Sequence, residues 1–71
     1  MSGMVKRLAI HVFMAKVAGI LDTVSAECNT FADIKGQDPL IAQVFNGLAT
    51  RLREMSHGLR HDVRTIMDDK G

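Results

Sequence analysis

Apolar residues recur along this chain at alternating steps of three and four, the spacing of one face of an α-helix. The stripe in the first half comprises Ile10, Phe13, Val17, Ile20, Val24 and Phe31. The stripe in the second half comprises Ile41, Phe45, Leu48, Leu52, Met55, Leu59 and Ile66. Both have the a/d spacing of a coiled coil, so each is expected to be the packing face of a long helix.

The strongest helix-breaking signals stand together between the two stripes. Gly36 suits the left-handed conformation found where helices end, Asp38 is a good N-cap, and Pro39 fits a first helical turn. The sequence therefore predicts helices over about 5–33 and 39–68, joined by a turn at 34–38. So short a connection allows only antiparallel neighbours.

The predicted fold class is all-α: a two-helix antiparallel hairpin that forms a single domain over residues 1–71. Folding at Gly36 makes the two apolar stripes face each other. In that arrangement Val24 lies opposite Leu48, and Val17 lies opposite Met55.

The first helix has more apolar residues than its stripe requires. Between residues 8 and 21 only His11 and Lys16 are polar, and a helix that is apolar all round is normally buried all round. The surplus face is made of Leu8, Val12, Met14, Ala15 and Leu21. We expect it to form the core of a four-helix-bundle homodimer or to dock on a different protein. An interfacial membrane helix is disfavoured, because the polar side has no cluster of Lys and Arg.

Composition supports association. The chain has 71 residues, which can bury only a marginal core, and its single cysteine, Cys28, allows no internal disulfide. A net charge of +1 gives no overall attraction to nucleic acid or membrane. The apolar run of the first helix is interrupted and shorter than a membrane span, so a cytoplasmic protein without cofactor or metal is expected.

Charge is distributed unevenly between the two ends of the predicted hairpin. Four carboxylates surround the turn: Asp22, Glu27, Asp33 and Asp38. Most cations lie toward the open end: Lys6, Arg7, Lys16, Arg51, Arg53, Arg60 and Arg64. Two hairpins that pack head to tail would bring opposite charges together, so charge favours this orientation in a dimer.

A cationic stripe follows the predicted outer side of the second helix. Its members are Arg53, His57, Arg60, His61 and Arg64. The stripe suits an acidic patch on a protein partner. Nucleic acid fits less well, because Glu54 and Asp62 interrupt the stripe and no aromatic residue is available for base stacking.

Residues that could carry chemistry are also concentrated in this segment. Ser56, His57 and Asp62 are the residue types of a hydrolase triad, but adjacent helical residues point about 100° apart, and a hairpin offers no oxyanion hole. His57 and His61 share one helical face and could chelate a metal weakly, whereas a stable site needs more ligands. No catalytic residue and no metal ligand is therefore predicted.

The segment from Met55 to Arg60 resembles the H-box of sensor histidine kinases, and Leu59–Asp62 is similar to a variant of that box. The resemblance implies a histidine phosphotransfer protein in which His57 or His61 accepts a phosphoryl group within a four-helix dimer. In this sequence Gly58 stands where the H-box has an acidic residue.

The predicted function is that of a small non-enzymatic module for protein–protein interaction. Such a module would bind a larger protein as a regulatory inhibitor, an anti-activator or a chaperone-like adaptor. Two alternatives stay open at this point. One is a self-assembling structural subunit, and the other is a histidine phosphotransfer or metal-binding protein.

Overall fold

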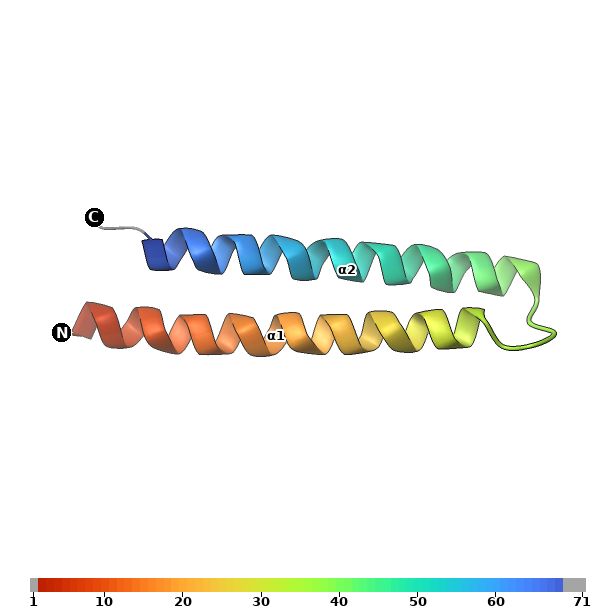
Figure 1. Cartoon of the computed structure of the whole chain (residues 1–71), viewed down its shortest axis with the longest axis horizontal. Helices are drawn as coiled ribbons and strands as arrows, with labels where there is room; N and C mark the ends of the chain where they lie inside the picture. Colours follow the sequence, from red (N-terminus) through yellow and green to blue (C-terminus); the bar gives the residue numbers. More distant parts are fainter. Residues whose placement is uncertain (1, 69–71) are drawn as a thin grey trace.

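The chain folds into two long helices that lie side by side and antiparallel (Figure 1). The structure is a computed structural model that describes residues 2–68. Helix α1 covers Ser2–Ala32 and helix α2 covers Pro39–Asp68, so the predicted all-α hairpin is confirmed. Compared with the predicted bounds, α1 begins three residues earlier and ends one residue earlier.

The turn depends on the residues that the sequence singled out. The Asp38 carboxylate accepts hydrogen bonds from the backbone N–H groups of Leu40 (2.8 Å) and Ile41 (3.4 Å), so Asp38 is the N-cap of α2. Gly36 has a φ of +81°, inside a turn that the Gln37 N–H closes onto the Ile34 carbonyl at 3.0 Å. A glycine adopts this conformation without the steric penalty that a Cβ atom brings.

The helices meet along a seam of small side chains, and here the predicted packing was wrong. The buried residues of this seam are Ala18, Ser25, Cys28 and Ala32 on α1, and Ala49, Ser56 and Val63 on α2. The predicted facing residues of α1 are instead largely exposed: Phe13, for example, is 65% exposed and Ala18 0%. Helix α1 is rotated by about one residue, or 100°, from the predicted orientation. Helix α2 is rotated by less, because four residues of its predicted stripe stay half-buried: Phe45, Leu52, Leu59 and Ile66.

Two hydrogen bonds between the helices show this register directly. The Ser25 hydroxyl donates to the Ala49 carbonyl at 2.8 Å, and the Ser56 hydroxyl donates to the Ala18 carbonyl at 3.3 Å. The predicted pairs were Val24 with Leu48 and Val17 with Met55, so each observed pair lies one residue further along both helices. Hydroxyls of helical Ser and Thr often bond their own helix four residues back, as Thr23 does to the Gly19 carbonyl at 3.0 Å. The serines can reach the other helix because small residues let the two backbones approach closely.

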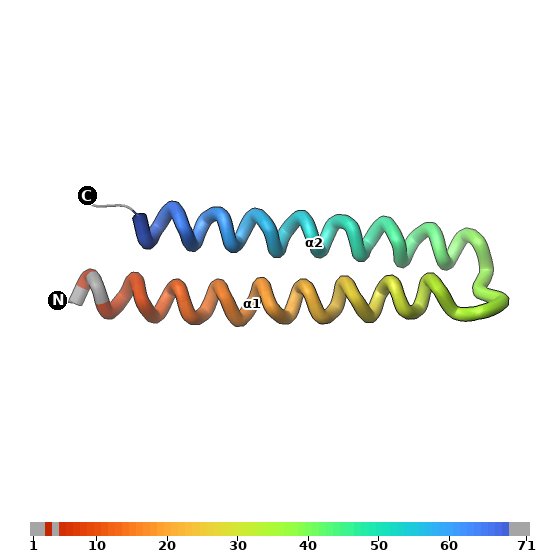
Figure 2. Tube along the Cα trace, viewed as in Figure 1, coloured from red at the N-terminus to blue at the C-terminus, as the bar shows by residue number. Residues whose placement is uncertain are grey.

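The hairpin is long and thin. Its extents are 56 × 15 × 10 Å, and the helices lie in a single layer with little curvature (Figure 2). Its radius of gyration is 16.4 Å, whereas a compact domain of this length has about 11 Å. A single layer of two helices leaves both of its broad sides uncovered.

The seam can be tested by overpacking. Because Ala18 is fully buried, Ala18→Leu should destabilise the hairpin by about 1–3 kcal/mol. The matched control is Ala9→Leu at an exposed position of the same helix, which should change stability by less than about 0.5 kcal/mol. Urea unfolding followed by circular dichroism at one fixed protein concentration measures both. Equal effects of the two changes would contradict the observed seam.

Two glycine substitutions should shift the melting temperature in opposite directions. Gly36→Ala places a Cβ atom at positive φ and should cost about 1 kcal/mol. Gly47→Ala lies inside α2, where an added Cβ atom would meet nothing within 4 Å, and should gain up to about 1 kcal/mol. Thermal melts of the two variants and the parent check this. A stabilised Gly36→Ala variant would show that the turn differs from the one described.

Candidate functional site

The large apolar residues gather on one broad side of the hairpin. In each helix they directly precede the seam residues, as Val24 precedes Ser25 and Leu48 precedes Ala49. Because the helices are antiparallel, residues one position before a seam residue lie on the same broad side of the hairpin in both helices. We name this side the apolar face, and its members are Ile10, Phe13, Val17, Ile20, Val24 and Phe31 of α1 and Ile41, Val44, Leu48 and Met55 of α2.

The apolar face is exposed and nearly continuous. Apart from the half-buried Val17 and Leu48, all of its members are exposed. Its charged interruptions are Glu27 on α1 and Arg51 and Asp62 on α2. A contiguous exposed apolar surface of this kind marks an interaction site in most soluble proteins. The whole stripe predicted for α1 is thus on this face, and not between the two helices. Of the stripe predicted for α2, Ile41, Leu48 and Met55 are on the face, whereas Phe45, Leu52, Leu59 and Ile66 are half-buried.

The turn end of the apolar face is held by an aromatic pair. The rings of Phe31 and Phe45 stack with centroids 5.5 Å apart and an angle of 27° between their planes. Phe31 is still half exposed, because only one of its faces is covered by this contact. The pair joins the apolar face to the seam.

The surplus apolar set predicted for α1 does not form one surface. Leu8, Val12 and Ala15 are exposed and lie away from the apolar face. Met14 and Leu21 are half-buried and fall on the same helical line as the buried seam residues Ala18 and Ser25. The structure therefore divides this set between the outer surface of the hairpin and the contact between its helices.

Helix α1 also has the length and composition of a membrane span between Val5 and Ala32, so the apolar run is longer than expected from its interruptions at His11 and Lys16. Only 11% of that apolar segment is buried within the hairpin. A core helix of a soluble protein and a signal sequence share this property, so the finding places no membrane around the chain.

The cationic stripe lies on the other side of α2. All five of its members, Arg53, His57, Arg60, His61 and Arg64, are exposed. Within the described residues, Arg60 is the member that forms an ion pair, with its Nη2 atom 2.8 Å from Oδ2 of Asp22. Arg60 also donates to the Ser56 hydroxyl, which links the surface ion pair to the seam.

The Ser56 hydroxyl and the Arg60 guanidinium lower the pKa of Asp22 below its ordinary value of 3.8, because both donate hydrogen bonds to the ionised carboxylate. The Ser56 hydroxyl donates to the Ala18 carbonyl and accepts from Arg60, which also pairs with Asp22. Asp22, Ser56 and Arg60 thus form one small network across the two helices.

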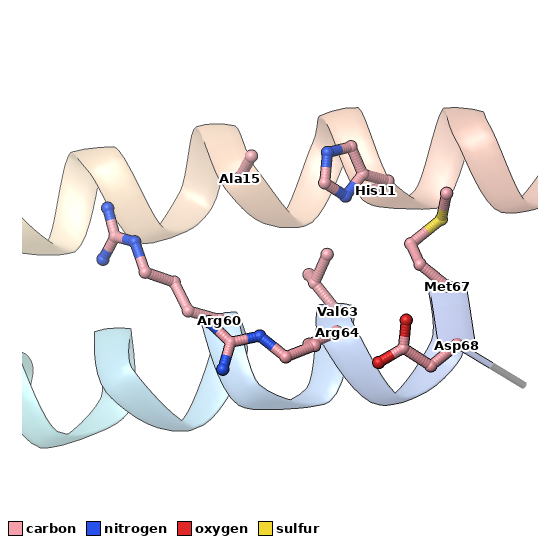
Figure 3. A pocket seen from close by; sticks show the side chains of 7 residues that line it. All are labelled: His11, Ala15, Arg60, Val63, Arg64, Met67 and Asp68. Atoms are coloured by element: carbon pink, nitrogen blue, oxygen red, sulfur yellow. The ribbon is translucent and has the colours of Figure 1, made fainter.

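A groove at the open end lies between the helices. It has a volume of about 420 Å³ and is lined by His11, Ala15, Arg60, Val63, Arg64, Met67 and Asp68 (Figure 3). The Nδ1 atom of His11 is buried there and has no hydrogen-bond partner within the described part of the chain. The groove could not be predicted from sequence, because its residues come from both helices and share no motif.

The residue types of a catalytic triad are separated by the fold. Ser56 is 1% exposed and its hydroxyl is engaged in the seam, whereas His57 and Asp62 lie on the surface. No three potential metal ligands come together anywhere in residues 2–68. His57 and His61 are both open to solvent, and the phosphotransfer that the H-box resemblance implies stays a prediction.

Comparisons with known proteins assign no family to this hairpin. No protein-family model, curated protein or solved structure matches the chain.

The Asp22–Arg60 pair can be tested through pH. Because the pKa of Asp22 is lowered in the folded chain, its carboxylate stabilises the fold above the unfolded pKa. That contribution is lost as the pH falls below 3.8 through the folded value. Asp22→Asn should therefore lower the melting temperature at pH 7 and make no difference once the parent carboxylate is protonated.

Glu54→Gln is the matched control, since Glu54 is exposed and forms no ion pair within residues 2–68. Melts of the parent and of both variants between pH 2 and pH 7 provide the comparison. A loss in Asp22→Asn that persists at the acid end would contradict an electrostatic role for this carboxylate.

Proposed function

We propose that this chain is a small non-enzymatic module for protein–protein interaction that docks a helical partner on its apolar face. The observation that supports the proposal is the gathering of ten large apolar side chains from both helices on one side of the hairpin. Full burial of one such side chain is worth about 1.5–3 kcal/mol, so covering the face is a strong driving force.

The shape of the face favours a helical partner. Two helices in one layer present two parallel rows of side chains, and side chains of another helix pack between such rows. One candidate partner of such a module is a larger protein. The module would then act on that protein as a regulatory inhibitor, an anti-activator or a chaperone-like adaptor. A second hairpin would instead complete the four-helix bundle expected from the sequence.

The two alternative functions differ from this proposal in the surface that they use. A structural subunit would need a second assembly surface in addition to the apolar face. A histidine phosphotransfer protein would use His57 or His61, which are exposed on the polar side of α2. The apolar face is the more extensive feature, so we favour the interaction module.

Site-specific photo-crosslinking tests the proposal in cells that produce the chain naturally. A photoreactive residue in place of Ile20, near the centre of the apolar face, should yield a crosslinked protein band of discrete mass. The matched position is Val12, which is 60% exposed on the same helix but lies away from the face. The Val12 position should yield no such band. Equal crosslinking from both positions, or no protein adduct from Ile20, would contradict the proposal.

A further inference from the structure

We infer that the partner on the apolar face is a second copy of this chain, packed head to tail to form a four-helix bundle. The inference rests on the proposed function, because it names the partner of the same face. Three observations support it: the surface area that the hairpin leaves exposed, the extent of the face along α1, and the charge of the two ends.

The exposed area matches what a dimer would bury. The hairpin exposes 5530 Å² at a mass of 7.8 kDa, whereas a compact protein of that mass exposes about 4,400 Å². A compact protein of twice the mass would expose about 7,300 Å², so two hairpins would bury about 3,800 Å² in reaching that value. Obligate homodimers bury roughly 2,000–5,000 Å². A second copy is therefore large enough to cover the excess surface that a single hairpin exposes.

The part of the face on α1 is suited to pairing with itself. It runs from Ile10 to Phe31, and Ile20 lies close to its middle. A two-fold axis across the helices near Ile20 sets two α1 helices antiparallel, with Ile10 of one copy beside Phe31 of the other. Val17 then lies beside Val24 in the same way. Two-fold interfaces of homodimers have this self-complementary form.

Charge decides between the two orientations that would cover the face. The half of the hairpin next to the turn, residues 22–52, has four carboxylates and two cations. The open half, residues 2–21 and 53–68, has six cations and three carboxylates. Head-to-tail packing brings the acidic half of each copy to the basic half of the other, whereas turn-to-turn packing brings like halves together. Exposed charges add little stability, but they select the orientation.

The first experiment measures the mass of the purified full-length chain by sedimentation equilibrium. The parent should be a dimer, and Phe13→Asp should weaken dimerisation by a factor on the order of 100, because a carboxylate would be buried without a partner. Val12→Asp is the matched control, since Val12 and Phe13 are similarly exposed in the hairpin. It should remain a dimer. Circular dichroism at high protein concentration checks that Phe13→Asp is still helical.

The second experiment tests the orientation by crosslinking thiols in a Cys28→Ala background. Ile10→Cys and Phe31→Cys lie about 31 Å apart on α1, at 1.5 Å per residue. In a head-to-tail dimer, a short bismaleimide should crosslink the two variants to each other when they are mixed. Neither variant should form a crosslinked dimer by itself. Ile20→Cys alone should also crosslink, because it lies near the two-fold axis. In a turn-to-turn dimer, neither the mixture of the two variants nor Ile20→Cys alone would form these crosslinks.

The outcomes separate this inference from the proposed function. A parent chain that stays monomeric at high concentration, while Ile20 crosslinks a larger protein in cells, overturns the second copy and leaves the interaction module standing. A dimer that survives Phe13→Asp but dissociates in Val12→Asp overturns both, because the contact would then lie on the other side of α1. Binding of the monomer to lipid vesicles through Phe13 would overturn both as well.

Discussion

Close packing of small side chains between the two helices is the constraint on which the rest of this structure depends. Ala18, Ser25, Ala49 and Ser56 occupy the centre of the seam, and none of them is large enough to hold the backbones apart. The serine hydroxyls can therefore reach carbonyl oxygens of the opposite helix. Because the centre of the seam is filled by small residues, larger apolar residues such as Met14, Leu21 and Leu52 are only half-buried beside it. The antiparallel geometry turns ten others, the members of the apolar face, to one side.

The same packing makes the isolated hairpin weak. Burial of alanine and serine removes little apolar area from water, and hydrophobic stabilisation scales with that area. Two hydrogen bonds between helices add only about 1 kcal/mol each. Residues such as Phe13 and Ile20, which could contribute most, are more than half exposed. The proposed covering of the apolar face would add the burial that the seam of a 71-residue hairpin does not supply.

How far the sequence could predict this structure depended on the range of the interactions involved. The helices and the turn follow from local chemistry, since an N-cap at Asp38 and a positive φ at Gly36 involve only neighbouring residues. The facing of the helices was mispredicted because two apolar stripes lie one residue apart, and periodicity alone ranks the stripe with larger side chains first. The informative pattern was the seven-residue spacing of Ala18 and Ser25, repeated by Ala49 and Ser56. The groove beside His11 could not be predicted, because it needs the relative placement of both helices.

Polar groups have different effects on the two contact surfaces of the hairpin. In the seam, the serines pair with specific carbonyls, so a slip of one residue would turn both hydroxyls away from their acceptors, and the register within the hairpin is fixed. The apolar face has no such pairs, and aliphatic side chains alone specify register weakly. Its charged positions, Glu27, Arg51 and Asp62, are few enough to leave the face apolar. In the proposed pairing of two copies, orientation on this face would therefore come from charge and affinity from buried area, so a change in one should leave the other largely intact.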